Sequence, residues 1–94
     1  MKVLISPGCG AGWSTWNCTE LAYDERIIAA FEKGITKEEM ENLCVALEYP
    51  KPYMGGFSTL KVVEIPKGAR FRITEHDGSE RVEILNLEDF LVAS

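Results

Sequence analysis

Near its N-terminus the chain reads Ser6-Pro7-Gly8-Cys9-Gly10-Ala11-Gly12-Trp13-Ser14-Thr15-Trp16. This stretch holds both tryptophans of the chain and follows the apolar run Val3-Leu4-Ile5. The pattern predicts a first strand over residues 2–5, followed by a glycine-rich loop. An uninterrupted apolar run indicates that the strand is covered on both faces. Because binding residues often lie on loops, the stretch is also the first candidate site.

The sequence after the loop predicts two helices. We expect the first over about residues 20–33, capped by Asn17 or Thr19, with Asp24 as a later start and Gly34 as a left-handed end.

For the second helix, Thr36 and Glu39 have the spacing of a capping box, so it should begin at Lys37. It should end at Tyr49, because a residue that precedes proline disfavours helix. Its buried stripe is expected to be Met40, Leu43, Cys44 and Leu47.

A second loop, Pro50-Lys51-Pro52-Tyr53-Met54-Gly55-Gly56-Phe57, is glycine-bearing and aromatic like the first, and looks like a partner to it. Beyond it the apolar period changes to two, which predicts strands over residues 60–65, 70–75 and 81–86. Residues 87–92 are expected to form a short turn or a further strand. The fold class is therefore predicted as α+β in one domain, residues 1–94: an N-terminal strand, a two-helix segment and a C-terminal antiparallel β-meander or hairpin.

The dipeptide Asp77-Gly78 predicts a two-residue hairpin turn, in which facing residue numbers sum to 155. The face that carries Phe71 and Ile84 should then be core. The opposite face carries three arginines and only Glu83 to balance them, which suits an anionic ligand, but a solvated face with ordinary cross-strand pairs is the favoured interpretation. Those arginines are Arg70, Arg72 and Arg81.

Charge and cysteine content exclude several classes of protein. A net charge of −5 argues against a general nucleic-acid binder. With no signal peptide and no membrane span, we expect a cytoplasmic protein. Three cysteines and a single histidine indicate no metal site, and no motif indicates a cofactor. A chain of 94 residues buries a modest core, so a homo-oligomer is expected.

The glycine loop matches neither well-known nucleotide motif. A Walker A loop needs a lysine after its last glycine, where this chain has Trp13, and the glycine spacing does not fit the dinucleotide fingerprint. Its backbone N–H groups and hydroxyls can still hold an anion, and Trp13 and Trp16 can stack on a planar ring. The alternative is that both tryptophans are core. A Cys9–His76 dyad is disfavoured, because His76 immediately precedes the turn.

The candidate ligand-binding residues come from the two loops and the arginine strand. They are Gly8, Cys9, Gly10, Ala11, Gly12, Trp13, Ser14, Thr15, Trp16, Tyr53, Met54, Gly55, Gly56, Phe57, Arg70 and Arg72.

The N-terminal stretch, the Tyr53–Phe57 loop and residues 66–80 together resemble a family of small uncharacterised bacteriophage and prophage proteins, over nearly the whole chain. The resemblance implies a phage origin and expression in a bacterial host, but no established activity. In that family a tyrosine can stand at the positions of Cys9 and His76, which also argues against the dyad. Small phage proteins with such a loop site look like counter-defence factors, some of which sequester nucleotide-derived immune signals between subunits.

The favoured hypothesis is a non-enzymatic, homo-oligomeric binder of a nucleotide-like small molecule. The alternatives are an acidic inhibitor of a host protein and an enzyme that acts on a nucleotide derivative.

Overall fold

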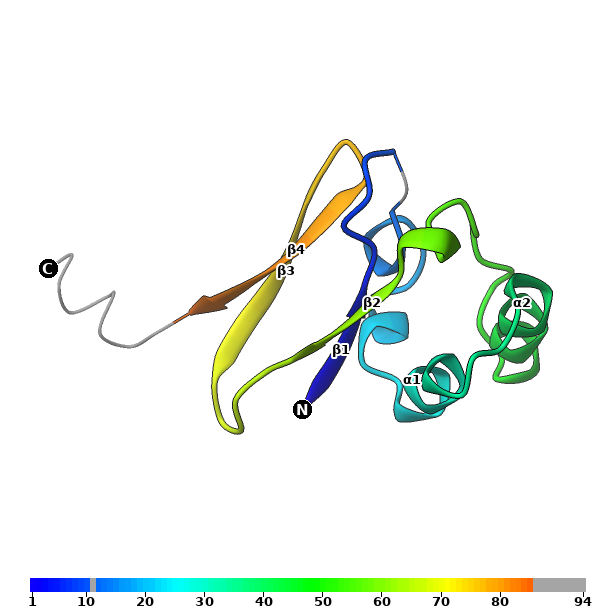
Figure 1. Cartoon of the computed structure of the whole chain (residues 1–94), viewed down its shortest axis with the longest axis horizontal. Helices are drawn as coiled ribbons and strands as arrows, with labels where there is room; N and C mark the ends of the chain where they lie inside the picture. Colours follow the sequence, from blue (N-terminus) through cyan, green and yellow to red (C-terminus); the bar gives the residue numbers. More distant parts are fainter. Residues whose placement is uncertain (11, 86–94) are drawn as a thin grey trace, which may run out of the picture.

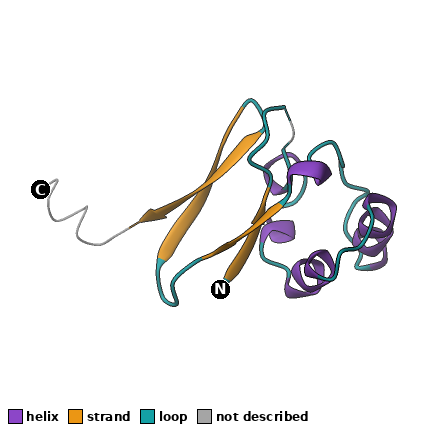
Figure 2. Cartoon of the chain, viewed as in Figure 1, coloured by secondary structure: helices purple, strands orange, loops and turns teal. Residues whose placement is uncertain are grey.

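Two antiparallel strand pairs and two helices build the fold, in a computed structural model that describes residues 1–10 and 12–85 (Figure 2). The order along the chain confirms the predicted α+β class. In chain order the elements are β1 (Lys2–Ile5), η1 (Ser14–Trp16), η2 (Thr19–Ala22), α1 (Glu25–Glu32), α2 (Lys37–Ala46), η3 (Phe57–Thr59), β2 (Lys61–Glu64), β3 (Arg70–His76) and β4 (Ser79–Leu85), where η denotes a short 3₁₀ helix.

The β1–β2 pair lies between the helices and the β3–β4 hairpin (Figure 1). β2, the first of the three predicted C-terminal strands, pairs with β1 and not with β3, in a register that runs from Lys2 opposite Glu64 to Ile5 opposite Lys61. β3 and β4 form the predicted hairpin. The chain therefore has three layers, and its N-terminal strand lies in the middle one.

β1 is covered on both faces, as its apolar run predicts. Leu4 is fully buried against Trp13 and the helices, whereas Val3 and Ile5 pack on the opposite side with Ala22 and the hairpin. Alternate side chains of a strand point to opposite faces, so a strand between two layers must be apolar throughout. The three consecutive apolar residues Val3, Leu4 and Ile5 meet this requirement.

The predicted first helix is divided in two. Residues 19–22 form a short 3₁₀ helix, and α1 begins only after Asp24, whose carboxylate accepts a hydrogen bond from the backbone N–H of Arg26. The later of the predicted starts is therefore the right one for α1. Gly34 follows this helix at φ +84°, as expected of a left-handed end.

α2 begins at Lys37 with the complete Thr36–Glu39 capping box, as predicted. It ends at Ala46, earlier than the proline rule indicates, because Glu48 adopts φ +69°. The N–H of Tyr49 then donates to the carbonyl of Cys44 at 3.0 Å and closes a Schellman motif. Cys44 is buried as predicted, and burial raises the pKa of its thiol to about 11.

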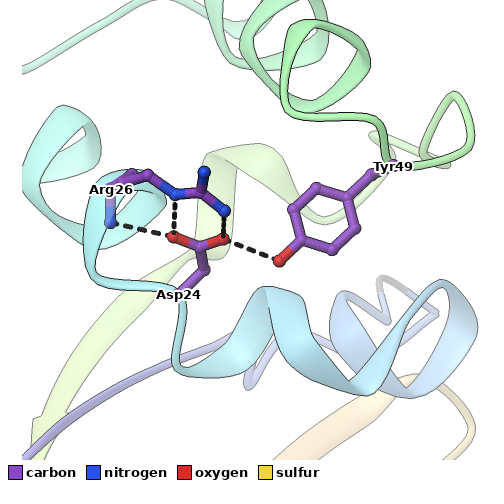
Figure 3. A network of polar contacts seen from close by, with 3 residues as sticks. All are labelled: Asp24, Arg26 and Tyr49. Carbon is purple, nitrogen blue, oxygen red and sulfur yellow. Dashed lines mark hydrogen bonds and ion pairs between the residues drawn. The ribbon is translucent and has the colours of Figure 1, made fainter.

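Asp24 also ties the start of α1 to the segment that follows α2 (Figure 3). Its carboxylate pairs with the Arg26 guanidinium, with the shortest contact at 2.7 Å, and accepts a hydrogen bond from the Tyr49 hydroxyl at 2.7 Å. The Arg26 hydrogen bonds, assisted by that of Tyr49, hold the pKa of Asp24 well below its usual range. Burial and the bond to Asp24 raise the pKa of Tyr49 to about 12.

The hairpin has the predicted register, with Phe71 opposite Ile84 and Asp77 and Gly78 both at positive φ. Its apolar face is less buried than expected: Phe71 is half-buried and Ile84 is 46% exposed. The reason is visible in Figure 1, where the end of the hairpin remote from the turn extends past the β1–β2 pair. Residues 86–92, for which strand and turn were predicted, lie outside the described residues.

Candidate functional site

The glycine loop folds back onto the β3–β4 turn. The backbone N–H of Gly10 donates to the carbonyl of Asp77, and the Ser79 hydroxyl donates to the carbonyl of Pro7 at 2.7 Å. At the start of β4 the N–H of Glu80 donates to the carbonyl of Ser6 at 2.8 Å. These bonds join segments about 70 residues apart and place the loop over the turn.

Glu80 provides the anion that the loop holds. Its fully buried carboxylate accepts hydrogen bonds from the backbone N–H groups of Ser6, Trp13 and Thr15, each at 2.9 Å, and from the Thr15 hydroxyl. The loop does present N–H donors to a carboxylate, but this carboxylate belongs to the same chain. The N–H groups of Trp13 and Thr15 are therefore not available to a ligand. The register contains the signal: Glu80 lies on the same face of β4 as Val82 and Ile84, where an acid needs buried partners.

Trp13 is a core residue, which corrects the expectation that it stacks on a ligand. Its side chain is fully buried in the cluster that contains Leu4 and Met40, and its indole Nε1 donates to the carbonyl of Leu21 at 3.4 Å. In a small domain one such ring supplies a large share of the buried apolar area. Trp16 has the opposite role and is 43% exposed.

The two glycine-aromatic loops lie together, although by a contact that the sequence did not specify. The rings of Trp16 and Tyr53 lie 5.4 Å apart between centroids, at 39°. Asn17 joins the loops: its Nδ2 donates to the carbonyls of Trp13 and Tyr53 at 2.9 and 3.1 Å, and its Oδ1 accepts from the N–H of Tyr53 at 2.7 Å. The sequence predicts only a helix cap at Asn17.

The loop glycines make room for side chains of the same chain. A Cβ at Gly12 would overlap the Trp16 ring, one at Gly55 the Tyr53 ring, and one at Gly8 the Thr59 side chain. Gly10 has open space but adopts φ +71°. These glycines therefore serve packing and turn geometry, and close approach of a ligand is not needed to explain them.

Three more predicted site residues lie in the interior or pack against it. Met54 is buried in the helix-side core, Phe57 packs against that core, and Gly56 caps η3. Ala11 lies outside the described residues.

A surface depression of about 390 Å³ unites two of the loop residues, Ser14 and Thr15, with the arginine strand. Arg72 lies at this depression but pairs with Glu83 through contacts of 3.0 to 3.2 Å, while Arg70 is exposed and does not line it. The lining residues are Ser14, Thr15, Thr19, Tyr23, Phe71, Arg72 and Ile73. Thr19, Tyr23, Phe71 and Ile73 were not among the predicted site residues.

A second depression, of about 440 Å³, lies at the hairpin turn and contains both Cys9 and His76. Cys9 is exposed, and the His76 imidazole is almost fully exposed beside Asp77, 3.4 Å from its carboxylate. The structure thus places the two residues of the disfavoured dyad at one surface without joining them by a hydrogen bond.

Within residues 1–10 and 12–85, no three His, Cys, Asp or Glu side chains come together as a metal site would require. None of the helices in the same ranges is long and apolar enough to cross a membrane.

Comparisons of the chain with protein-family models, curated proteins and solved structures gave no match.

Proposed function

We propose that the chain is a non-enzymatic binder of a nucleotide-derived small molecule, which it holds in the depression between the 3₁₀ helices η1 and η2 and strand β3. The observation that carries this proposal is that Ser14 and Thr15, at the end of the glycine loop, line the same depression as Arg72. Its volume of about 390 Å³ lies within the range of small-molecule sites, roughly 300–1,000 Å³.

The lining suits a planar ring that lies next to an anionic group. Tyr23 and Phe71 offer aromatic surface to a base, and the hydroxyls of Ser14 and Thr19 offer hydrogen bonds. Arg72 supplies the cation, and because Glu83 already pairs with it, an anionic ligand has to share or displace that carboxylate. The loop N–H groups held by Glu80 take no part in binding.

A homo-oligomer belongs to the same proposal. The depression is open to solvent along one side of a small domain, and a second copy laid over it would exclude water and strengthen the Arg72 contact. The resemblance to phage proteins supports a role in sequestering a nucleotide immune signal inside a bacterial host. Light scattering with and without ligand tests whether binding and assembly are linked.

The ligand test uses cyclic ADP-ribose isomers and cyclic dinucleotides with the purified protein. We expect one of these compounds to raise the melting temperature and to be recovered intact after denaturation. Arg72→Gln should reduce the shift, whereas Arg70→Gln, on the same strand but outside the depression, should not. No shift with any compound, or equal shifts for both variants, would contradict the proposal.

The enzyme alternative has its own observation and its own outcome. Cys9 and His76 share the depression at the turn, so a ligand recovered in altered form, with loss of the reaction in Cys9→Ser, would favour catalysis there. Inhibition of a host protein, the remaining alternative, would leave every small molecule without effect.

A further inference from the structure

Trp16 and Tyr53 form an exposed pair that lines neither depression, and the Glu75 carboxylate at the edge of this pair also lines the depression at the hairpin turn. The two rings are 43% and 48% exposed, and Trp16 Nε1 donates to Glu75 Oε1 at 3.0 Å. We propose that this pair and Glu75 form a docking surface for an arginine side chain of a basic partner protein. We call these three residues the aromatic patch. This proposal is independent of the small-molecule site.

The aromatic patch is held in place before any partner binds. Asn17 fixes the Tyr53 backbone by two hydrogen bonds, and the missing side chains of Gly12 and Gly55 let the rings lie directly on the backbone. Rigid, exposed aromatic side chains are the usual anchors of protein interfaces, because little conformational freedom is lost when they bind.

The charge of the patch selects a cation. The faces of aromatic rings carry negative potential, and an indole whose N–H donates to a carboxylate becomes a better partner for a cation. The hydrogen bonds from Trp16 and from the backbone N–H of Gly78 lower the pKa of Glu75, so this carboxylate is charged at neutral pH. The chain as a whole carries a net charge of −5.

Arginine fits the patch better than lysine does. Trp16 and Gly78 both donate to Oε1 of Glu75, and among the described residues Oε2 accepts no hydrogen bond. A planar guanidinium can lie on a ring and donate to a carboxylate oxygen at the same time, which the ammonium group of lysine does less well.

The test uses the ¹⁵N-labelled protein and follows its two tryptophan indole signals during titration with acetyl-Gly-Arg-Gly-amide. Trp16→Phe assigns the signals. We expect the arginine peptide to shift the Trp16 signal and not that of buried Trp13, and added salt to weaken the binding. The same peptide with citrulline, which keeps the shape of arginine without its charge, should bind about fivefold more weakly.

Two single-charge variants separate a local effect from net charge. Glu75→Gln keeps an acceptor oxygen for Trp16 and Gly78 and should weaken arginine-peptide binding about threefold. Glu64→Gln removes the same charge from β2 and should leave binding unchanged, as should Arg72→Gln in the small-molecule depression.

Three results would overturn the proposal. One is equal binding of the citrulline and arginine peptides, and another is equal binding by the two glutamate variants. The third is a shift of the Trp16 signal by adenosine but not by the arginine peptide, which would make the patch a stacking surface for a base.

Discussion

The carboxylate of Glu80 accepts a hydrogen bond from the backbone N–H of Trp13 at 2.9 Å, and both side chains are fully buried. This contact joins the N-terminal loop to the last described strand, 67 residues later in the chain. It explains why N–H donors of the loop, which could bind an anion, already have an acceptor without a ligand.

Replacement of Glu80 should be among the most destabilising changes in the chain. Glu80→Ala leaves the buried N–H groups of Ser6, Trp13 and Thr15 without an acceptor, and we expect a loss of about 3 kcal/mol or more. Glu80→Gln keeps one oxygen and should fall between this variant and the wild type. Urea denaturation measures both, with Glu83→Gln on the exposed face of the same strand as the control. A Glu80→Ala protein as stable as that control would contradict the assignment.

The two tryptophans should respond differently to substitution. Trp13→Ala removes a buried ring from the core and should cost about 3–5 kcal/mol. Trp16→Ala should cost clearly less, because much of its ring faces solvent. Thermal unfolding of the two variants, followed by circular dichroism, gives the comparison. Equal losses would mean that Trp16 is also a packing residue.

Acid should weaken the ion pair of Asp24 with Arg26 and its hydrogen bond with Tyr49. The folded-state pKa of Asp24 lies below its unfolded value near 3.9, so its contribution is fully present above pH ~4 and is lost as the pH falls below that value. Asp24→Asn should therefore be less stable than wild type at pH 7, and the difference should shrink towards pH 3. Urea midpoints at the two pH values measure this change. Asparagine caps a helix about as well as aspartate. A difference that stays constant would therefore show that altered hydrogen bonding to Arg26 and Tyr49, and not the charge of Asp24, carries the effect.

Glu48 offers a stabilising substitution. It adopts φ +69° at the position of the Schellman motif that glycine usually occupies, and an L-residue in that conformation costs about 1 kcal/mol. Glu48→Gly should raise the melting temperature, whereas Glu48→Ala, which keeps the Cβ, should not. Differential scanning calorimetry of the two variants provides the measurement. If alanine stabilises as much as glycine, removal of the charge is the cause.

Gly12→Ala should disturb the aromatic patch while leaving the depression between η1, η2 and β3 intact. The added Cβ overlaps the Trp16 ring, so the ring must turn away and its hydrogen bond to Glu75 should break. We expect a changed Trp16 indole signal and loss of arginine-peptide binding, with the Trp13 signal unmoved. Gly10→Ala is the matched control, because open space surrounds that position and its cost is confined to backbone strain.

The sequence by itself determined the local structure. The Thr36–Glu39 capping box, the Gly34 end, the hairpin register through Asp77 and Gly78, and the cover of β1 on both faces each follow from residues close in the chain. Short-range hydrogen bonds and alternation of apolar residues specify such features, and the structure confirms them. The division of the first helix depends on Asp24, which caps α1 instead of continuing a helix from residue 20. The early end of α2 depends on Glu48, which adopts a left-handed conformation instead of a helical one.

Only the tertiary structure decided which loop groups face solvent. Sequence patterns indicate that donors and rings are present in the glycine loop, but Glu80 and the core compete for them from distant parts of the chain. The buried carboxylate uses the N–H groups of Trp13 and Thr15, the core encloses the Trp13 ring, and Trp16 is left outside against Tyr53. A buried donor or ring is satisfied by whatever the fold brings to it, and local sequence does not encode that partner.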